Sequence, residues 1–528
     1  MRTSLIKGFK WILLLLAITL FLALALRAYD ARRGPELSPW HTVVPSELTA
    51  DAIDAADWDT YLKREDQIFL QVRNEVMQRS APGVTPPINR YYKGSIVDTA
   101  KFARDWNRSY VLKPVAKPLG AVVLLHGLTD SPYSLRRIGQ LYVDHGFVAV
   151  AIRLPGHGTV PAGLTDVTWE AWMAATRLAV REARRRAGPD APLHLVGFSN
   201  GGALAMKYSL DALEQGGLAR PSQIVLISPM IGITRFARIA GLAELPALLP
   251  AFAKAAWLDV VPEFNPFKYN SFPVNGARQS HRLTVALQRQ LVRLSGASVM
   301  ASLPPVLTFQ SVTDHTVSTP AVLSALYAYL PANGSELVLF DVNRAATISS
   351  LLSAASSHAL ARLMPPLPEL YRLTVLGSSV AKDGSVEERV IEAGEVVQSV
   401  RALDLVYPSQ VFSLSHVAIP FSVDDPLYGT EPTQGAPAYG VSLGTLRARG
   451  ERGTLIVNFD SLSRIASNPL FPYVVARIEQ GIASIPGPAH GLEGKAKIAA
   501  EANARHERTP QPTLPMELES ELKADLSP

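Results

Sequence analysis

A serine lies between two glycines in the stretch GFSNG at residues 197–201, where an apolar run meets a helical pattern. Residues 192–199 are predicted as a strand and residues 200–213 as a helix. A serine at such a junction is typical of a nucleophile elbow, which presents the hydroxyl at the carboxyl edge of a sheet. A tight structural turn is the alternative, but this context favours Ser199 as the nucleophile of an acyl-transfer reaction.

A serine hydroxyl is a weak nucleophile, so it needs a general base and a carboxylate that orients the base. On a sheet of this kind the expected order along the chain is serine, acid, histidine. Asp314 ends the predicted strand at 305–314 and is the candidate for the acid. Asp314 as the cap of the following helix is the alternative, but Ser318 is also placed to cap that helix.

The general base is harder to assign, because several histidines follow Asp314. Apart from the adjacent histidine, they are His358, His416, His490 and His506. His416 ends the apolar stretch QVFSLSH and precedes a loop that is able to carry it to Ser199, so His416 is the predicted base. His358 lies in a helical pattern and remains the alternative, whereas the last two histidines lie in a polar tail.

Two backbone amides are expected to bind the oxyanion that forms in the reaction. Asn200 follows the nucleophile at the start of the predicted helix, where N–H groups have no intrahelical partner. Leu128 lies in the loop HGLTDSPYS after the first central strand and is the second expected donor. His126 opens the same loop, but it precedes Ser199 along the chain, so the expected order excludes it as the general base.

The elements that must position these residues alternate between strands and helices. Strands are predicted at 120–127, 192–199, 223–229, 305–314 and 336–342, a strand with its following loop at 147–158, and helices at 134–146, 168–186, 200–213 and 318–330. Short apolar strands that alternate with helices predict an α/β fold, a mostly parallel central sheet with helices on both faces. Residues 230–300 look helical and are interpreted as a cap. Residues 345–410 hold a helix-like stretch, the strand-like YRLTVL and the charged KDGSVEER, and are interpreted as a second insertion.

The stretches LLHGLTDSPYS, RLPGHGT, GFSNGG, VTDHTV and SLSHVAIPF together resemble the α/β-hydrolase superfamily. Within it the chain is similar to the branch of monoacylglycerol lipases and carboxylesterases that is grouped with serine aminopeptidase-like hydrolases. The resemblance covers roughly residues 115–340 and 410–430. It implies an α/β-hydrolase fold and a catalytic triad of Ser199, Asp314 and His416. It also implies Leu128 and Asn200 as the oxyanion donors. The long connection from the acid to His416 departs from the family pattern, which keeps His358 as an alternative.

The predicted organisation assigns a part to each region of the chain. It comprises a basic segment at 1–10, a transmembrane anchor or signal segment at 11–27, a linker and N-terminal helical region at 28–114, an α/β-hydrolase domain at 115–488 and a disordered tail at 489–528. The uncharged run after Lys10 favours an uncleaved anchor over a cleaved signal peptide. Residues 453–462 are a further candidate strand beside the sheet.

Composition excludes several classes of function. The chain has 528 residues and no cysteine, which excludes disulfides, thiolate metal sites and a cysteine nucleophile. Its formal net charge of +5 is small and spread out, and no nucleic-acid motif is present. No histidines stand at metal-ligand spacing and no phosphate-binding loop has its lysine, so neither a metal nor another cofactor is expected.

The sequence therefore predicts a membrane-anchored serine hydrolase that cleaves carboxylic esters, with lipidic acyl esters such as monoacylglycerols as expected substrates. The expected partners are a small-molecule ester or lipid and, through the N-terminal helix, a membrane. The expected location is a bacterial inner membrane with the catalytic domain outside the cytoplasm, or secretion if the leader is cleaved. An aminopeptidase-like amidase, an acyltransferase and a non-catalytic scaffold with this fold are the alternatives.

Overall fold

The computed structural model describes most of the chain between residues 35 and 484. The described ranges are 35–80, 88–232, 250–347, 352–379, 383–433, 439–444 and 465–484, together with residue 349 and short stretches between residues 9 and 29. The candidate strand at 453–462, the predicted tail at 489–528 and part of the predicted cap, residues 233–249, lie outside these ranges.

The predicted membrane segment at 11–27 falls partly outside the described residues. The structure describes residues 11–12, 14–15, 18–19, 21–22 and 25–26 of it, all of them helical. Among the residues that the structure describes, no helix is long and apolar enough to cross a membrane.

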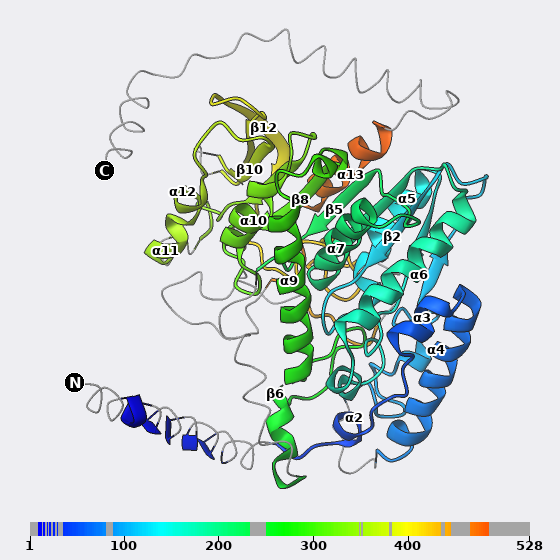
Figure 1. Ribbon diagram of the computed structural model, residues 1–528. Coiled ribbons are helices and arrows are strands. Elements are labelled where there is room, and N and C mark those ends of the chain that lie inside the picture. The colour runs from blue at the N-terminus through cyan, green and yellow to red at the C-terminus, as the bar shows by residue number, and fades with distance from the viewer. Residues whose placement is uncertain are drawn as a thin grey trace. The chain divides into compact units, whose positions relative to one another are not determined.

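The centre of the fold is a ten-stranded sheet with the strand order β1-β3-β2-β4-β5-β8-β9-β10-β11-β12 (Figure 1). The strands are β1 (Tyr110–Leu112), β2 (Gly120–Leu125), β3 (Phe147–Ala151), β4 (Leu193–Phe198), β5 (Gln223–Ile227), β8 (Val306–Ser311), β9 (Glu336–Phe340), β10 (Arg372–Ser378), β11 (Ser385–Ile391) and β12 (Gln398–Val406). The strands from β3 to β10 in this order pair in parallel, whereas β1, β11 and β12 pair antiparallel. The predicted mostly parallel sheet is confirmed.

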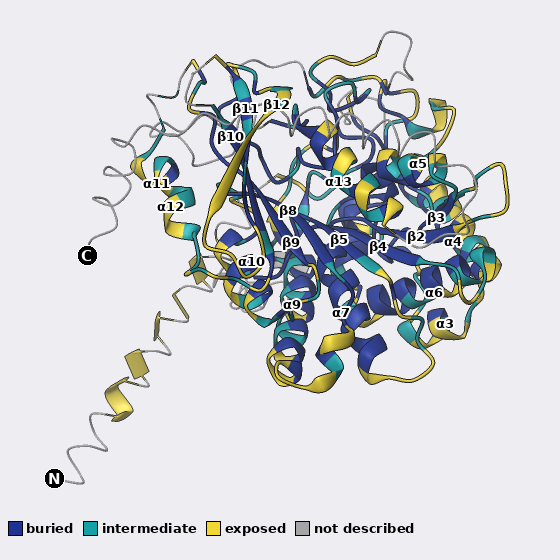
Figure 2. Ribbon diagram, turned by 90° about the horizontal axis from the view of Figure 1, so that it is seen from above, coloured by how far each residue is buried: buried dark blue, intermediate teal, exposed yellow. Residues whose placement is uncertain are grey.

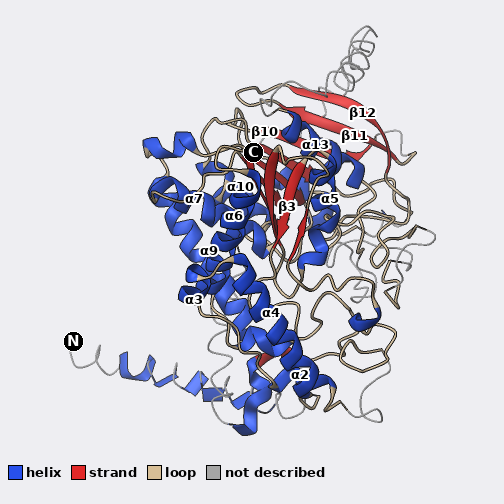
Figure 3. Cartoon of the chain, turned by 90° about the vertical axis from the view of Figure 1, so that its right-hand side faces the viewer, coloured by secondary structure: helices blue, strands red, loops and turns tan. Residues whose placement is uncertain are grey.

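Helices cover both faces of this sheet, as Figures 2 and 3 show. One face carries α6 (Trp169–Ala187), α7 (Asn200–Glu214), α9 (Val274–Leu294) and α10 (Thr319–Ala325), and the other carries α5 (Arg136–Asp144) and α13 (Phe471–Ala483). Strands β2, β4 and β8 are buried at every residue. Burial from both sides explains why β2, with the sequence GAVVLL, is a continuous apolar run without alternation.

Shorter elements connect the layers. They are η2 (Thr99–Lys101), η3 (Pro132–Leu135), η4 (Pro161–Thr165), η6 (Pro250–Ala256), η7 (Ser298–Ser302), η8 (Tyr327–Tyr329) and a two-stranded sheet of β6 (Trp257–Asp259) and β7 (Phe272–Pro273). Within the described part of the predicted cap, α9 packs beside α7 on one face of the central sheet. The first turn of α9 reaches the loop after β2, because a Cβ atom on Gly276 would lie 3.8 Å from Leu128 Cδ1.

The second predicted insertion, at 345–410, lengthens the central sheet. It contains α11 (Ala354–Ser357), α12 (Ala359–Leu363) and the strands β10, β11 and β12. Strand β10 pairs in parallel with β9, and β11 and β12 follow as an antiparallel hairpin. The segment that separates Asp314 from His416 is therefore built onto the edge of the sheet.

The N-terminal region forms part of the same fold. It contains α2 (Pro39–Thr42), α3 (Ala50–Ala55) and α4 (Trp58–Val72), followed by the π-helical turn η1 (Arg73–Met77). Ile53, Trp58 and Tyr61 belong to the same hydrophobic core as α6. Arg153, at 1% exposure, donates to Glu47 at 2.7 Å and to Glu65 at 3.1 Å. These buried ion pairs fix residues 35–72, part of which was predicted as a linker, to the loop after β3.

Candidate active site

Ser199 is the residue that turns strand β4 into helix α7. Its φ angle is 54°, a left-handed conformation that costs energy for a residue with a side chain. Backbone hydrogen bonds hold this turn: the Ser199 N–H donates to the Ile227 carbonyl at 2.9 Å, and the Met230 N–H donates to the Ser199 carbonyl at 2.9 Å. Strand β5 and the residues after it therefore fix the backbone of the elbow that the sequence predicts.

The glycines around Ser199 are required by close packing of the backbone. A Cβ atom on Gly201 would lie 1.9 Å from the Leu125 carbonyl oxygen. A Cβ atom on Gly197 would lie 2.3 Å from the Gly201 carbonyl oxygen. Both contacts are with backbone atoms of buried elements, which are unable to move away as a flexible side chain would.

We expect the substitution Gly201→Ala to lower the free energy of unfolding by about 3 kcal/mol or more, because β2 has no room for the added methyl group. The melting temperature of the purified variant, followed by circular dichroism, measures this loss. Gly216→Ala is the control, since a Cβ atom there meets no atom within 4 Å. Equal melting temperatures for the two variants would contradict the expected clash.

The structure brings Asp314 and His416 into contact although they are 102 residues apart in the chain. His416 Nδ1 lies 2.9 Å from Asp314 Oδ2. Three further donors surround the carboxylate: the Thr316 N–H at 2.8 Å, the Val317 N–H at 2.9 Å and Gln310 Nε2 at 3.0 Å. Because a carboxylate only accepts hydrogen bonds, Nδ1 of the neutral imidazole carries the proton and Nε2 does not.

The environment keeps the Asp314 carboxyl ionised. Burial alone would raise its pKa, because the side chain is fully covered. The charge and hydrogen bond of His416, together with the amides of Val317 and Thr316, outweigh burial and hold the pKa of Asp314 below its ordinary value. Asp314 is therefore an anion at neutral pH, as the partner of an imidazole that becomes protonated must be.

His416 lies beside the elbow. Its imidazole stacks on the ring of Phe198, the residue before Ser199, with 5.3 Å between the ring centroids and 30° between the planes. Ser311 at the end of β8 donates through Oγ to the Leu414 carbonyl at 2.8 Å, which fixes the loop that carries His416. The alternative base, His358, is exposed at the junction of α11 and α12. The histidine that binds the predicted acid is thus His416.

Asp425 anchors the segment after His416, a contact that the sequence does not predict. Arg136 Nη2 donates to its carboxylate at 2.6 Å, and the Tyr133 hydroxyl donates at 3.0 Å. These bonds tie the segment after His416 to η3 and α5, which follow the predicted oxyanion loop. An aspartate in a loop carries no sequence signal for partners nearly 300 positions away, so only the fold identifies this contact.

The two predicted oxyanion donors lie on segments that meet at Ser199. A Cβ atom on Gly127 would lie 3.2 Å from the Ser199 Cβ atom, so the loop that carries Leu128 packs directly against the elbow. Asn200 is the first residue of α7. Within the described ranges, no backbone or side-chain acceptor binds the main-chain N–H of Leu128 or of Asn200. Both amides therefore have the unpaired hydrogen that oxyanion binding requires.

His126 orients the peptide that carries the Leu128 amide. The Leu154 N–H donates to His126 Nε2 at 3.1 Å, so the ring proton is on Nδ1, which donates to the Gly127 carbonyl at 2.9 Å. In a planar trans peptide the carbonyl and the N–H point in opposite directions, so fixing the Gly127 carbonyl also fixes the direction of the Leu128 N–H. Burial lowers the pKa of His126 to about 3, so this arrangement persists at neutral pH.

Buried histidines are expected to make the fold sensitive to acid. Burial lowers the pKa of His126 and His194 to about 3 and that of His41 to about 4, from about 6.5 in an unfolded chain. Below pH 6.5 the unfolded chain binds protons that the folded chain does not, so the free energy of unfolding falls on acidification.

We expect each of His126 and His194 to lower stability by roughly 2 kcal/mol at pH 5 relative to pH 7.5. Urea unfolding midpoints at the two pH values measure this effect. In His194→Gln, the difference in the free energy of unfolding between the two pH values should be smaller by roughly that amount, because glutamine does not titrate. The two midpoints should therefore lie closer together than in the wild type. Identical midpoints at both pH values would show that these histidines are not buried in neutral form.

Comparison with known proteins adds to this geometry. Residues 116–341 match the family model described as "Serine aminopeptidase, S33". The thermostable monoacylglycerol lipase of Bacillus sp. (strain H-257) is 25% identical over 222 residues, which are 42% of this chain and 80% of that protein.

Similar solved structures include a metagenome-derived lipolytic enzyme from the LipS and LipT pair and the monoacylglycerol lipase of Paleococcus ferrophilus. The first is 22% identical with a TM-score of 0.36, covering 45% of this chain and 88% of that chain. The second is 18% identical with a TM-score of 0.32, covering 44% of this chain and 88% of that chain.

Proposed function

From the premise that residues 116–341 belong to an α/β-hydrolase domain of the lipase and esterase type, we propose that this chain is a serine hydrolase that cleaves carboxylic esters. The observation that carries the proposal is the hydrogen-bonded pair of His416 and Asp314 beside the strained elbow of Ser199. A nucleophile, a base and an orienting carboxylate on different elements are the parts that acyl transfer needs.

In the proposed mechanism, Ser199 Oγ attacks the ester carbonyl carbon while His416 Nε2 takes the hydroxyl proton. Asp314 keeps the imidazole in the required tautomer and stabilises the imidazolium that forms. The amides of Leu128 and Asn200 bind the oxyanion. The imidazolium then gives its proton to the departing alcohol, and water attacks the acyl-serine by the same route to release the acid.

We propose lipidic acyl esters such as monoacylglycerols as the substrates. The relative from Bacillus is a monoacylglycerol lipase. The first turn of α9 also supports an apolar acyl group, because Phe272 and Leu128 lie beside Gly276 and are both partly exposed. Leu128 belongs to the proposed oxyanion loop, where the acyl chain of a bound ester would begin.

Amide cleavage at a peptide N-terminus is the second candidate, because the matching family model is described as a serine aminopeptidase. Such an enzyme needs a carboxylate that binds the free amine. Of the two glutamates in the predicted cap, Glu244 lies outside the described residues. Glu263 is buried and accepts hydrogen bonds from the Asn270 and Ser271 amides at 3.0 and 2.8 Å. Because the Glu263 carboxylate is already hydrogen-bonded within its own loop, ester cleavage is favoured over cleavage at a peptide N-terminus.

A panel of p-nitrophenyl esters from acetyl to palmitoyl, compared with aminoacyl p-nitroanilides, tests the proposal. We expect turnover of the esters, with kcat/KM highest for the longer acyl chains, and no turnover of the anilides. A fluorophosphonate probe should label Ser199 covalently. Turnover of anilides in preference to esters would favour the aminopeptidase, and a folded protein without labelling would be a non-catalytic scaffold.

We further propose that residues 11–27 anchor the chain in a membrane, with the hydrolase domain outside the cytoplasm. The uncharged run between Lys10 and Arg27 supports the anchor. The orientation is our proposal alone, because three cations precede the run and Arg27, Arg32 and Arg33 follow it. Fractionation of cells that express the full chain tests it. Recovery in the membrane fraction after a carbonate wash is the expected result, and recovery of the full-length chain in the soluble fraction would contradict the anchor.

A further inference from the structure

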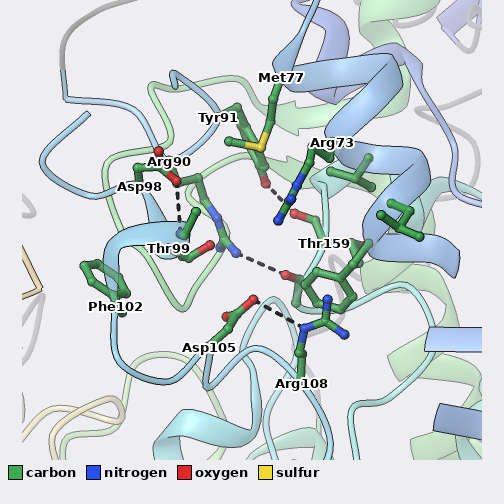
Figure 4. Close-up of a pocket in the computed structure, with 15 residues that line it drawn as sticks. Arg73, Met77, Arg90, Tyr91, Asp98, Thr99, Phe102, Asp105, Arg108 and Thr159 are labelled. Carbon is green, nitrogen blue, oxygen red and sulfur yellow. Dashed lines mark hydrogen bonds and ion pairs between the residues drawn. The ribbon is translucent and has the colours of Figure 1, made fainter. Parts of the chain in front are cut away.

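A pocket of about 250 Å³ lies between the end of α4, the π-helical turn η1 and residues 90–108 (Figure 4). Its far wall is formed by Gly158 and Thr159 of the loop after β3. None of the residues proposed for ester hydrolysis lines this pocket. Its volume is below the range of roughly 300–1,000 Å³ that is usual for drug-sized ligands, so it suits a small molecule or a headgroup.

The pocket carries positive charge that its own walls do not neutralise. Arg73, Arg90 and Arg108 line it. Arg108 is paired, because its Nη1 lies 2.6 Å from Asp66 Oδ1. In the part of the chain that the structure describes, Arg73 and Arg90 form no ion pair. Two guanidinium groups therefore face this pocket without a direct ion pair, and among the described residues the only carboxylate with a charge interaction with Arg90 is that of buried Glu263, which does not line the pocket.

The side chain of Arg90 is the strongest indication of a ligand. Arg90 is 5% exposed, and its Nη2 donates to the Gly158 carbonyl at 3.1 Å. Its Nη1 is buried and has no hydrogen-bond partner among the described residues. The rings of Tyr91 and Tyr269, 5.5 and 5.8 Å from the guanidinium carbon, offset part of the cost of burying this charge. A buried cationic donor without an acceptor is costly, and an anionic oxygen is its natural partner.

The aspartates in the pocket wall are bound within their own loop. Asp98 Oδ1 accepts from the Ala100 N–H at 3.0 Å, and Oδ2 accepts from the Gly94 N–H at 3.0 Å. Asp105 Oδ1 accepts from the backbone and side-chain nitrogens of Asn107 at 3.1 and 2.8 Å. These carboxylates hold the shape of the loop, so they do not compete for Arg73 and Arg90.

The geometry of η1 places Arg73 at the pocket. The Gln78 N–H donates to the Arg73 carbonyl at 3.3 Å, the i to i+5 bond of a π-helix. Such turns are frequent at functional sites. Figure 4 shows Arg73 and Arg90 reaching the pocket from opposite sides, with Met77 and Tyr91 nearby. The guanidinium groups thus converge on a space that also has apolar walls.

We propose that this pocket binds a phosphate group, carried by a small phosphorylated molecule or by a phospholipid headgroup, between Arg73 and Arg90. Two guanidinium forks match the geometry and the double negative charge of a phosphate monoester. The apolar side chains of Met77 and Phe102 then contact the organic part of the ligand. This binding site is separate from the proposed esterase site and does not rest on the proposed function.

Isothermal titration of the folded chain with inorganic phosphate and with glycerol 3-phosphate tests the soluble form of the ligand. We expect saturable binding that Arg73→Gln and Arg90→Gln each weaken about tenfold or more. Arg293→Gln is the matched control, because Arg293 is an exposed arginine on α9 that pairs with Glu214, and it should change binding less than about twofold. Since Arg73 is exposed, Arg73→Gln keeps the test valid if Arg90→Gln does not fold.

Co-sedimentation with phosphatidic acid vesicles and with phosphatidylcholine vesicles distinguishes the two sources of phosphate. Binding to phosphatidic acid vesicles that Arg73→Gln abolishes, without binding of the soluble phosphates, would identify a lipid headgroup as the ligand. Binding of the soluble phosphates that Arg73→Gln weakens would identify a free metabolite. Absence of binding in every arm, or equal binding by wild type and both variants, would overturn the proposal.

Discussion

Replacing Ser199 or His416 by alanine is expected to lower kcat for p-nitrophenyl ester hydrolysis by about 10⁵-fold, with little change in KM. Ser199 supplies the oxygen that attacks the carbonyl, and His416 takes its proton, so neither works without the other. The double variant should therefore lose no more activity than either single variant. Steady-state kinetics with the best ester of the panel measures all three.

His358→Ala is the matched control for this experiment, because His358 is exposed on the inserted segment and does not contact Asp314. We expect its kcat to stay within about twofold of the wild type. Melting curves should show that the variants are folded, so that lost activity reports lost chemistry. Activity that disappears in His358→Ala and survives in His416→Ala would transfer the role of base to His358.

The central sheet could be predicted because its strands obey a simple physical rule. Strands β2 and β3 are buried at every residue, so they appear as uninterrupted apolar runs between helical patterns. The elbow could be predicted because its glycines leave a local sequence pattern, and that pattern is imposed by backbone contacts of Gly197 and Gly201. Asp314 could be singled out because it closely follows an apolar strand at the carboxyl edge of the sheet, where ligands bind; in the structure this strand, β8, ends at Ser311.

The long-range contacts could not be predicted, because they join residues that share no local pattern. Asp425 binds Arg136 across 289 positions, and Arg153 binds Glu47 across 106. A sequence shows that such residues are charged, but not that they are buried together. Strand β10 could be predicted from the strand-like stretch YRLTVL at 371–376. Strands β11 and β12 could not, since β11 largely alternates half-buried with buried residues and β12 is mostly exposed, so neither has the continuous apolar run of a central strand.

The second large effect is expected for Asp314→Asn, which keeps the shape of the side chain and removes its charge. Each carboxylate oxygen accepts two hydrogen bonds, Oδ1 from the amides of Thr316 and Val317 and Oδ2 from His416 and Gln310. Backbone amides only donate, whereas a glutamine side chain is able to turn and present its oxygen, so the asparagine oxygen should take the place of Oδ1. The new NH₂ group then faces His416 Nδ1. Because an NH₂ group donates, Nδ1 must accept, and the ring proton moves to Nε2. An imidazole protonated at Nε2 is unable to take the proton of Ser199, so kcat should fall about 10⁴-fold while KM changes little.

Steady-state kinetics of Asp314→Asn, together with the partly exposed control Asp424→Asn, separates this tautomer effect from a general loss of charge. Asp424 lies in the segment after His416 and pairs with Arg137 at the surface, a contact worth at most about 1 kcal/mol, so its variant should retain nearly full activity. The ¹⁵N chemical shifts of the His416 ring offer a readout independent of turnover, because they distinguish a proton on Nδ1 from one on Nε2. If Asp314→Asn kept both its activity and an Nδ1-protonated ring, the carboxylate would have no part in the reaction, and the contact between Asp314 and His416 would be purely structural.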